Sequence, residues 1–166
     1  MSIKHSLLPE FDHEMATTRR LLDRVPEDRG EWRPHPKSKT MGELAAHIAE
    51  LPGFVASVIT LPSYDFLSAQ GSRRRMKFET AAGMLEALDR GVTAAHDVID
   101  AMTDVQMMET WSLLRGGKAM FTLPRAGVFR TLLLSHIIHH RGQLSVYLRL
   151  NDVPLPVCYG STADES

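Results

Sequence analysis

The chain has 166 residues, of which 43% are hydrophobic and 23% charged, which is typical of one globular domain and not of a disordered segment. Nineteen basic and twenty acidic side chains give a formal net charge of −1, which argues against a nucleic-acid-binding protein. The longest apolar stretch, residues 51–61, is shorter than the roughly 20 residues of a membrane span and is interrupted by Pro52 and closed by Pro62.

The first two predicted helices are separated by a proline-rich loop. Residues 3–25 have apolar positions three and four apart, which predicts an amphipathic helix whose regular part starts close to Pro9 and which ends at Pro26. Residues 26–39 have no such period and are expected to form a loop. A second helix is predicted from Thr40, because Thr40-Met41-Gly42-Glu43 has the pattern of a capping box, and its apolar positions continue to about residue 61.

The middle of the chain is predicted to be irregular and then helical. Residues 62–79 have no period, and their run Arg73-Arg74-Arg75 is interpreted as a solvated loop. Thr80 is a suitable cap for a third helix that extends to about Met102.

The last third is predicted to contain a small β-hairpin and a fourth helix. Residues 110–113 and 120–122 flank Gly116-Gly117, a common two-residue turn signal. The helix covers about residues 124–150. Four helices of this length, each with an apolar stripe, predict an all-α four-helix bundle with a small β-hairpin between the third and fourth helices, in one domain over residues 1–166.

Three histidines form a candidate metal site. His136 and His140 are four residues apart on the fourth helix, so their side chains lie on one face and can bind one ion. His136 and His139 form a less favourable pair. His47 lies on the buried stripe of the second helix with Leu44, and a histidine among leucines needs a hydrogen-bond partner or a metal.

Two interpretations of these histidines follow from spacing alone. They are either core histidines that hydrogen-bond within the protein, with a solvated His139, or they are ligands of one divalent metal ion. Three neutral nitrogen ligands would leave open positions on the ion, which is typical of a catalytic site. Zinc and nickel both suit imidazole.

Four blocks of the sequence form a recognisable pattern: Leu8-Pro9-Glu10-Phe11 with Thr18-Arg19, residues 32–38 leading into Gly42-Glu43-Leu44-Ala45-Ala46-His47, residues 136–143, and Val153-Pro154-Leu155-Pro156 with Tyr159-Gly160. In these blocks, and over nearly its whole length, the chain resembles the DinB/YfiT-like superfamily of metalloenzymes.

This resemblance implies a fold, a metal and a reaction class. The implied fold is an up-up-down-down four-helix bundle, and the family's metal triad matches His47, His136 and His140, with zinc or nickel as the expected divalent ion. Relatives with assigned activity are mostly transferases or isomerases that use low-molecular-weight thiols, and homodimers are common. This chain departs from the family pattern at two positions: many relatives have Asn in place of Ser135 and Pro in place of Ser161. Ser135 therefore lacks the side-chain amide that would help to orient a metal ligand.

Four further residues are candidates for the pocket or for contacts to the metal ligands. His139 is about 100° of helix rotation from His140 and is interpreted as a neighbour and not a ligand. Gln143 lies one turn beyond His140, Glu50 follows His47 by three residues and could orient its ring, and Trp32 is a candidate for the pocket rim.

Two other side chains are expected to have no part in the chemistry. Arg141 is interpreted as a solvated or interface charge, and Cys158 as an inert thiol. A single cysteine excludes an intrachain disulfide and a cysteine-based zinc cage, and with no secretory pattern at the N-terminus it favours a cytoplasmic protein.

Three functions remain open. The first is a metal-dependent transferase in which the ion activates a thiol for attack on an electrophilic small molecule. The second is a metal-dependent hydrolase, which ranks lower because no general-base glutamate accompanies the triad. The third is a non-catalytic metal-binding or ligand-binding bundle. No nucleic-acid or membrane partner is expected.

Overall fold

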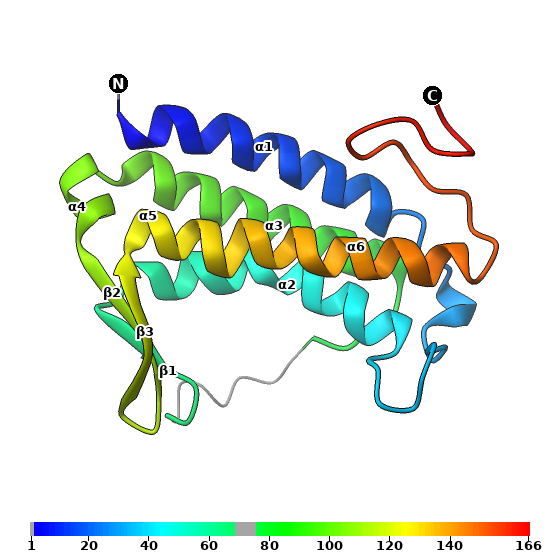
Figure 1. Ribbon diagram of the computed structural model, residues 1–166, viewed down its shortest axis with the longest axis horizontal. Helices are drawn as coiled ribbons and strands as arrows, with labels where there is room; N and C mark the ends of the chain where they lie inside the picture. Colours follow the sequence, from blue (N-terminus) through cyan, green and yellow to red (C-terminus); the bar gives the residue numbers. More distant parts are fainter. Residues whose placement is uncertain (1, 69–75) are drawn as a thin grey trace.

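Four long helical segments lie side by side in the computed structural model, which describes residues 2–68 and 76–166 (Figure 1). The prediction of a mostly helical chain is confirmed, and the predicted arginine loop at 73–75 lies outside the described residues. The segments are α1 (Ile3–Leu22), α2 (Met41–Ile59), α3 (Ala81–Ala101) and a final rod made of α5 (Arg125–Val128), η2 (Phe129–Ser135) and α6 (His136–Arg149).

The starts of α2 and α3 are where local capping chemistry predicts them. The Thr40 hydroxyl accepts a hydrogen bond from the Glu43 amide at 3.1 Å, and the Glu43 carboxylate accepts one from the Thr40 amide at 2.8 Å, which completes the predicted capping box. The Thr80 hydroxyl accepts from the Gly83 amide at the start of α3. These caps fix the entry of both helices into the core.

The helix directions differ from the up-up-down-down order that the family resemblance implied. Figure 1 shows that α1 and α6 run in one direction and that α2 and α3 run in the other. The ion pairs Lys4–Asp100 and Arg19–Asp89 agree, since they join α1 to α3 in antiparallel fashion. The α2–α3 connection, residues 60–80, is long enough to return the chain along the bundle, because extended chain advances about 3.3 Å per residue and a helix only about 1.5 Å. The consecutive helices α2 and α3 therefore run parallel, and the order in the chain is up-down-down-up.

A three-stranded sheet closes one end of the helices (Figure 1). β2 (Thr110–Arg115) pairs antiparallel with β3 (Lys118–Pro124) across Gly116 and Gly117, whose φ angles of 59° and 77° suit glycine. β1 (Ser63–Asp65) adds in parallel to β2. The short helices η1 (Glu27–Arg29) and α4 (Asp104–Met108) complete the fold, and neither they nor β1 were predicted.

Residues 129–135 of the predicted fourth helix form a π-helix. Each π turn contains an extra residue, so it rotates the side chains that follow relative to a regular α-helix. The α-helical geometry resumes at His136. The side chains of α6 are therefore rotated about the helix axis by an amount that the apolar periodicity of the sequence does not predict.

Close packing and buried polar contacts join the elements. A Cβ added to Gly91 of α3 would lie 2.7 Å from the Gly53 nitrogen of α2, so these helices approach at two glycines. The fully buried Trp111 of β2 donates from its indole nitrogen to the Val58 carbonyl of α2. Arg125, at the start of the rod, donates to the Ile59 carbonyl. The sheet is thus fixed to the end of α2.

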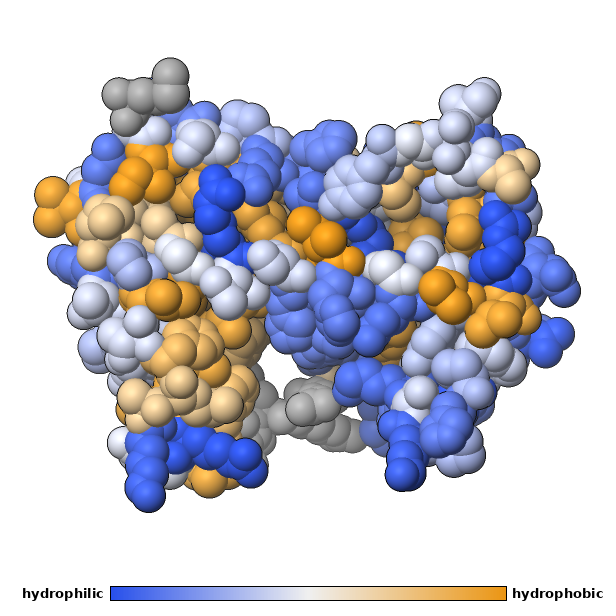
Figure 2. Space-filling view, in the orientation of Figure 1, coloured by the Kyte–Doolittle hydropathy of each residue, from blue (hydrophilic) through white to orange (hydrophobic). Residues whose placement is uncertain are grey.

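Apolar residues occupy both the core and part of the surface. α2 is long and apolar enough to cross a membrane by length and composition, but 67% of its apolar window is buried inside the protein, as expected for a core helix. Apolar surface is visible at the end of the molecule that carries α4 and the sheet (Figure 2), where Val105, Met108 and Met120 are exposed.

Candidate metal centre

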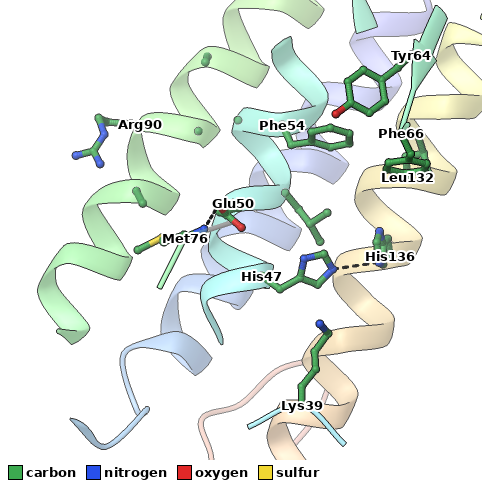
Figure 3. A pocket seen from close by; sticks show the side chains of 15 residues that line it. Lys39, His47, Glu50, Phe54, Tyr64, Phe66, Met76, Arg90, Leu132 and His136 are labelled. Carbon is green, nitrogen blue, oxygen red and sulfur yellow. Dashed lines mark hydrogen bonds between the residues drawn. The ribbon is translucent and has the colours of Figure 1, made fainter. Parts of the chain in front are cut away.

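The three predicted histidines come together from two helices. His47 projects from α2, and His136 and His140 project from the first turns of α6. The His136 Nε2 atom lies 3.4 Å from Nε2 of His47 and 2.9 Å from Nε2 of His140. All three rings are half-buried, and their nearest ligand atoms lie within 4.8 Å of one another. Figure 3 shows His47 and His136 facing each other across the gap between the helices.

Local structure accounts for this convergence. His47 is placed by its neighbours Leu44, Ile48 and Leu51, which are buried in the core and fix the rotation of α2. His136 and His140 share one face of α6 because they are four residues apart. α2 and the rod pack against each other, so the two faces meet.

The distances between the nitrogens suit a metal ion. In a tetrahedral site with Zn–N bonds of 2.0–2.1 Å, two ligand nitrogens are about 3.3 Å apart. The measured separations of 2.9 and 3.4 Å lie close to this value. The three-histidine group could therefore hold one divalent ion.

The surroundings of α6 favour the neutral imidazoles that a metal needs. Burial lowers the pKa of His136, and the nearby charge of His140 lowers it further. Burial also lowers the pKa of His140, although its hydrogen bond with Gln143 acts in the opposite direction. Both rings therefore remain deprotonated to a lower pH than a solvated histidine.

Gln143 and His139 both lie next to His140 but differ in their contacts. The Gln143 side-chain oxygen lies 2.7 Å from Nδ1 of His140, so Nδ1 is the donor and Nε2 keeps its lone pair for the centre. His139 is exposed, and its ring packs edge-on against that of His140 with centroids 5.0 Å apart. Gln143 is thus placed to orient the ring of His140, one of the three candidate metal ligands.

Glu50 lines the pocket, whereas Trp32, the candidate for its rim, is not among the residues that line it. Glu50 lines the pocket beside His47, and its carboxylate accepts a hydrogen bond from the Met76 backbone amide. Trp32 packs edge-on against Tyr147 of α6, with ring centroids 5.5 Å apart, and its carbonyl accepts from the Met41 amide. Trp32 therefore supports the start of α2 and the flank of α6.

A pocket of about 810 Å³ opens beside His47 and His136. Its walls are mostly apolar and aromatic, and Figure 3 shows Phe54, Tyr64 and Phe66 at the end away from Lys39. Ligand pockets commonly combine such walls with a few polar groups. Its position gives a small molecule access to the histidine group.

The sequence analysis missed one polar residue near the centre, Lys39, and was wrong about the burial of another, Arg141. Lys39 lines the pocket and points toward His47 and His136 in Figure 3. Its position directly before the Thr40 cap could have indicated that it lies at the start of the helix that carries His47. Arg141 is not a solvated charge: only 3% of it is exposed, and it forms an ion pair with the buried Glu14 of α1. The signal for this pair was weak, because 127 residues separate the partners.

The fold and the site together define a mostly helical protein with a three-histidine group at the edge of an apolar pocket. A sequence model of the DinB superfamily matches residues 10–144, and the chain belongs to that superfamily.

Solved structures of DinB-like proteins are similar to this chain along its length. One from Bacillus cereus aligns with a TM-score of 0.70 and 20% sequence identity over 92% of this chain and 95% of the other. Another from Bacillus subtilis has a TM-score of 0.69 and 18% identity over 92% and 96%. At these identities the similarity establishes the fold alone. A search of curated proteins finds no match.

Proposed function

We propose that the protein binds one divalent metal ion, zinc or nickel, through Nε2 of His47, His136 and His140, and uses it in a thiol-dependent transfer to an electrophilic small molecule. The observation that supports this best is the convergence of three imidazole nitrogens at the edge of a pocket. With three protein ligands, a bound ion would keep a position for an exchangeable group, and its charge would stabilise a thiolate at neutral pH.

The protein's own side chains would prepare this reaction. Gln143 holds His140 in the tautomer that presents Nε2 to the centre. The apolar walls of the pocket would hold the body of the electrophile. In the transfer, the thiol sulfur forms a bond to the electrophilic carbon, the leaving group departs with its electron pair, and the thiol proton passes to water.

Hydrolysis is the second candidate, and one residue favours it. Glu50 is the one carboxylate among the described residues that line the pocket, and it is the available general base for an attacking water. Its carboxylate already accepts a hydrogen bond from the Met76 amide, so part of its accepting capacity is taken before a water can bind to it. We therefore rank transfer above hydrolysis. We also propose a cytoplasmic homodimer without nucleic-acid or membrane partners, which the near-neutral charge and the family resemblance support.

The test uses protein purified without a histidine tag. Metal analysis should give about one zinc or nickel ion per chain. His47→Ala should lose this ion, whereas His139→Ala, which removes an exposed neighbouring histidine, should retain it. The loaded protein should convert monobromobimane in the presence of cysteine or glutathione faster than the same thiol does without protein, and should not convert it when no thiol is added. Hydrolysis of 4-nitrophenyl acetate without thiol would instead support the second candidate, and full metal content in His47→Ala would contradict both.

A further inference from the structure

The two ends of the pocket differ in chemistry. At one end three aromatic rings form a chain of edge-on contacts, with centroids 5.2 Å apart for Phe54 and Tyr64 and 5.5 Å apart for Tyr64 and Phe66. At the other end lie His47, His136 and the ammonium group of Lys39 (Figure 3). A ligand that fills this pocket must match an apolar surface and a polar, positively charged one.

Lys39 is held in place by the start of α2. It directly precedes Thr40, which is buried and closed into the capping box with Glu43. The next two amides, those of Met41 and Gly42, donate to the carbonyls of Trp32 and Gly30. The backbone of Lys39 is therefore rigid, and the side chain extends from a fixed point toward the histidine group.

The ammonium group of Lys39 lacks an anionic partner. Lys39 as a whole residue is half-buried, and within residues 2–68 and 76–166 its ammonium group forms no ion pair with a carboxylate. Glu50, which lines the same pocket, is engaged by the Met76 amide. A cation at the wall of a largely apolar pocket, without a carboxylate beside it, favours an anion as the group that binds there.

Arg90 is a second cation of the same pocket and serves as an internal comparison. Its guanidinium points away from the histidines in Figure 3 and lies 3.6 Å from the Glu86 carboxylate. Its side chain is 71% exposed. The positive charge directed at the histidine end of the pocket therefore comes from Lys39.

We propose that the pocket binds an amphipathic monoanion whose charged group contacts Lys39 beside the histidine group and whose apolar body packs against Phe54, Tyr64 and Phe66. This inference rests in part on the proposed function, since a metal ion at the histidines would add to the attraction for the anion. The contact with Lys39 does not require the ion, so it can be tested in metal-free protein.

The experiment compares two probes that differ in charge and have the same apolar body, 4-phenylbutyrate and 4-phenylbutyramide. Isothermal titration calorimetry is carried out on metal-free and zinc-loaded protein. The metal-free wild type should bind the carboxylate about 10-fold or more tightly than the amide, because a charge-assisted hydrogen bond is stronger than a neutral one. The Lys39→Met variant should lose this preference, and Arg90→Met should keep it.

Controls separate this proposal from the proposed function. The zinc content of Lys39→Met should equal that of the wild type, which shows that the metal centre and the fold are intact. If zinc fails to bind while the carboxylate preference depends on Lys39, the metal function is wrong and the anion site stands. Equal binding of the two probes, a preference that survives in Lys39→Met, or no binding of either probe at millimolar concentration would overturn the anion site.

Discussion

The buried ion pair between Arg141 and Glu14 provides a quantitative test of the packing around the centre. Arg141 directly follows His140, and its guanidinium lies 2.5 Å from the Glu14 carboxylate. The two side chains are 4% and 10% exposed. The guanidinium also donates to the Glu14 carbonyl and the Thr18 hydroxyl, and the Tyr159 hydroxyl donates to the Glu14 carboxylate. The pair thus joins α1, α6 and the C-terminal tail.

Replacing Arg141 by methionine should destabilise the protein strongly. Removal of one partner of a buried ion pair costs about 3–5 kcal/mol, because the other charge stays buried. The Tyr159 hydroxyl would still donate to Glu14 after the substitution, so we expect the lower part of this range, about 3 kcal/mol. The double variant Glu14→Met/Arg141→Met should recover most of this loss, because it leaves no buried charge.

Urea unfolding followed by circular dichroism measures these changes. Arg130→Met is the matched control, since Arg130 also pairs with an α1 carboxylate, that of Glu10, but the two side chains are 52% and 39% exposed. An exposed pair contributes about 0–1 kcal/mol. A loss in Arg141→Met no greater than that in Arg130→Met would refute the reasoning from burial.

Three further predictions concern packing, pH and the metal ligands. Gly91→Ala places a Cβ 2.7 Å from the Gly53 nitrogen and should lower the unfolding free energy by about 1–3 kcal/mol in urea titrations, whereas Gly142→Ala, where a Cβ meets nothing within 4 Å, should not. Because the pKa values of His136 and His140 are lowered, the unfolded chain binds more protons below about pH 6.5. The melting temperature of metal-free protein should thus be lower at pH 5.5 than at pH 7. If the double variant His136→Gln/His140→Gln shows the same decrease as the wild type, these two histidines are not the cause of the pH dependence. Gln143→Leu should weaken zinc binding by about 10–100-fold in chelator competition, and unchanged affinity would exclude an orienting role.

Local signals in the sequence were sufficient for the starts of α2 and α3 and for the histidine group, but not for α1, which begins at Ile3 and contains Pro9, the residue near which its start is predicted. The capping box at Thr40 needs only residues that are three apart, and the pairing of His136 with His140 needs only the helical repeat. His47 could be added because a polar residue on a buried stripe requires a partner. These features depend on a few neighbouring residues, which the sequence displays directly.

Long-range features could not be predicted in this way. The parallel strand β1 pairs with β2, some fifty residues later in the chain, and helical periodicity carries no information about this register. Residues 129–135 are predicted to be part of a regular α-helix, because nothing in their apolar pattern marks a π-helix. The rotation that the π-helix gives to the side chains after it could therefore not be predicted from the sequence. The burial of Arg141 depends on Glu14, and the orientation of Lys39 depends on how the loop before α2 packs.

Crystals grown with zinc or nickel and measured on both sides of the metal absorption edge test the central claim most directly. We predict one anomalous peak per chain, about 2.0–2.1 Å from Nε2 of His47, His136 and His140, with room for a further ligand on the side of the pocket. A crystal without a peak there, or an ion bound by other side chains while these three rings remain hydrogen-bonded to one another, would contradict the account.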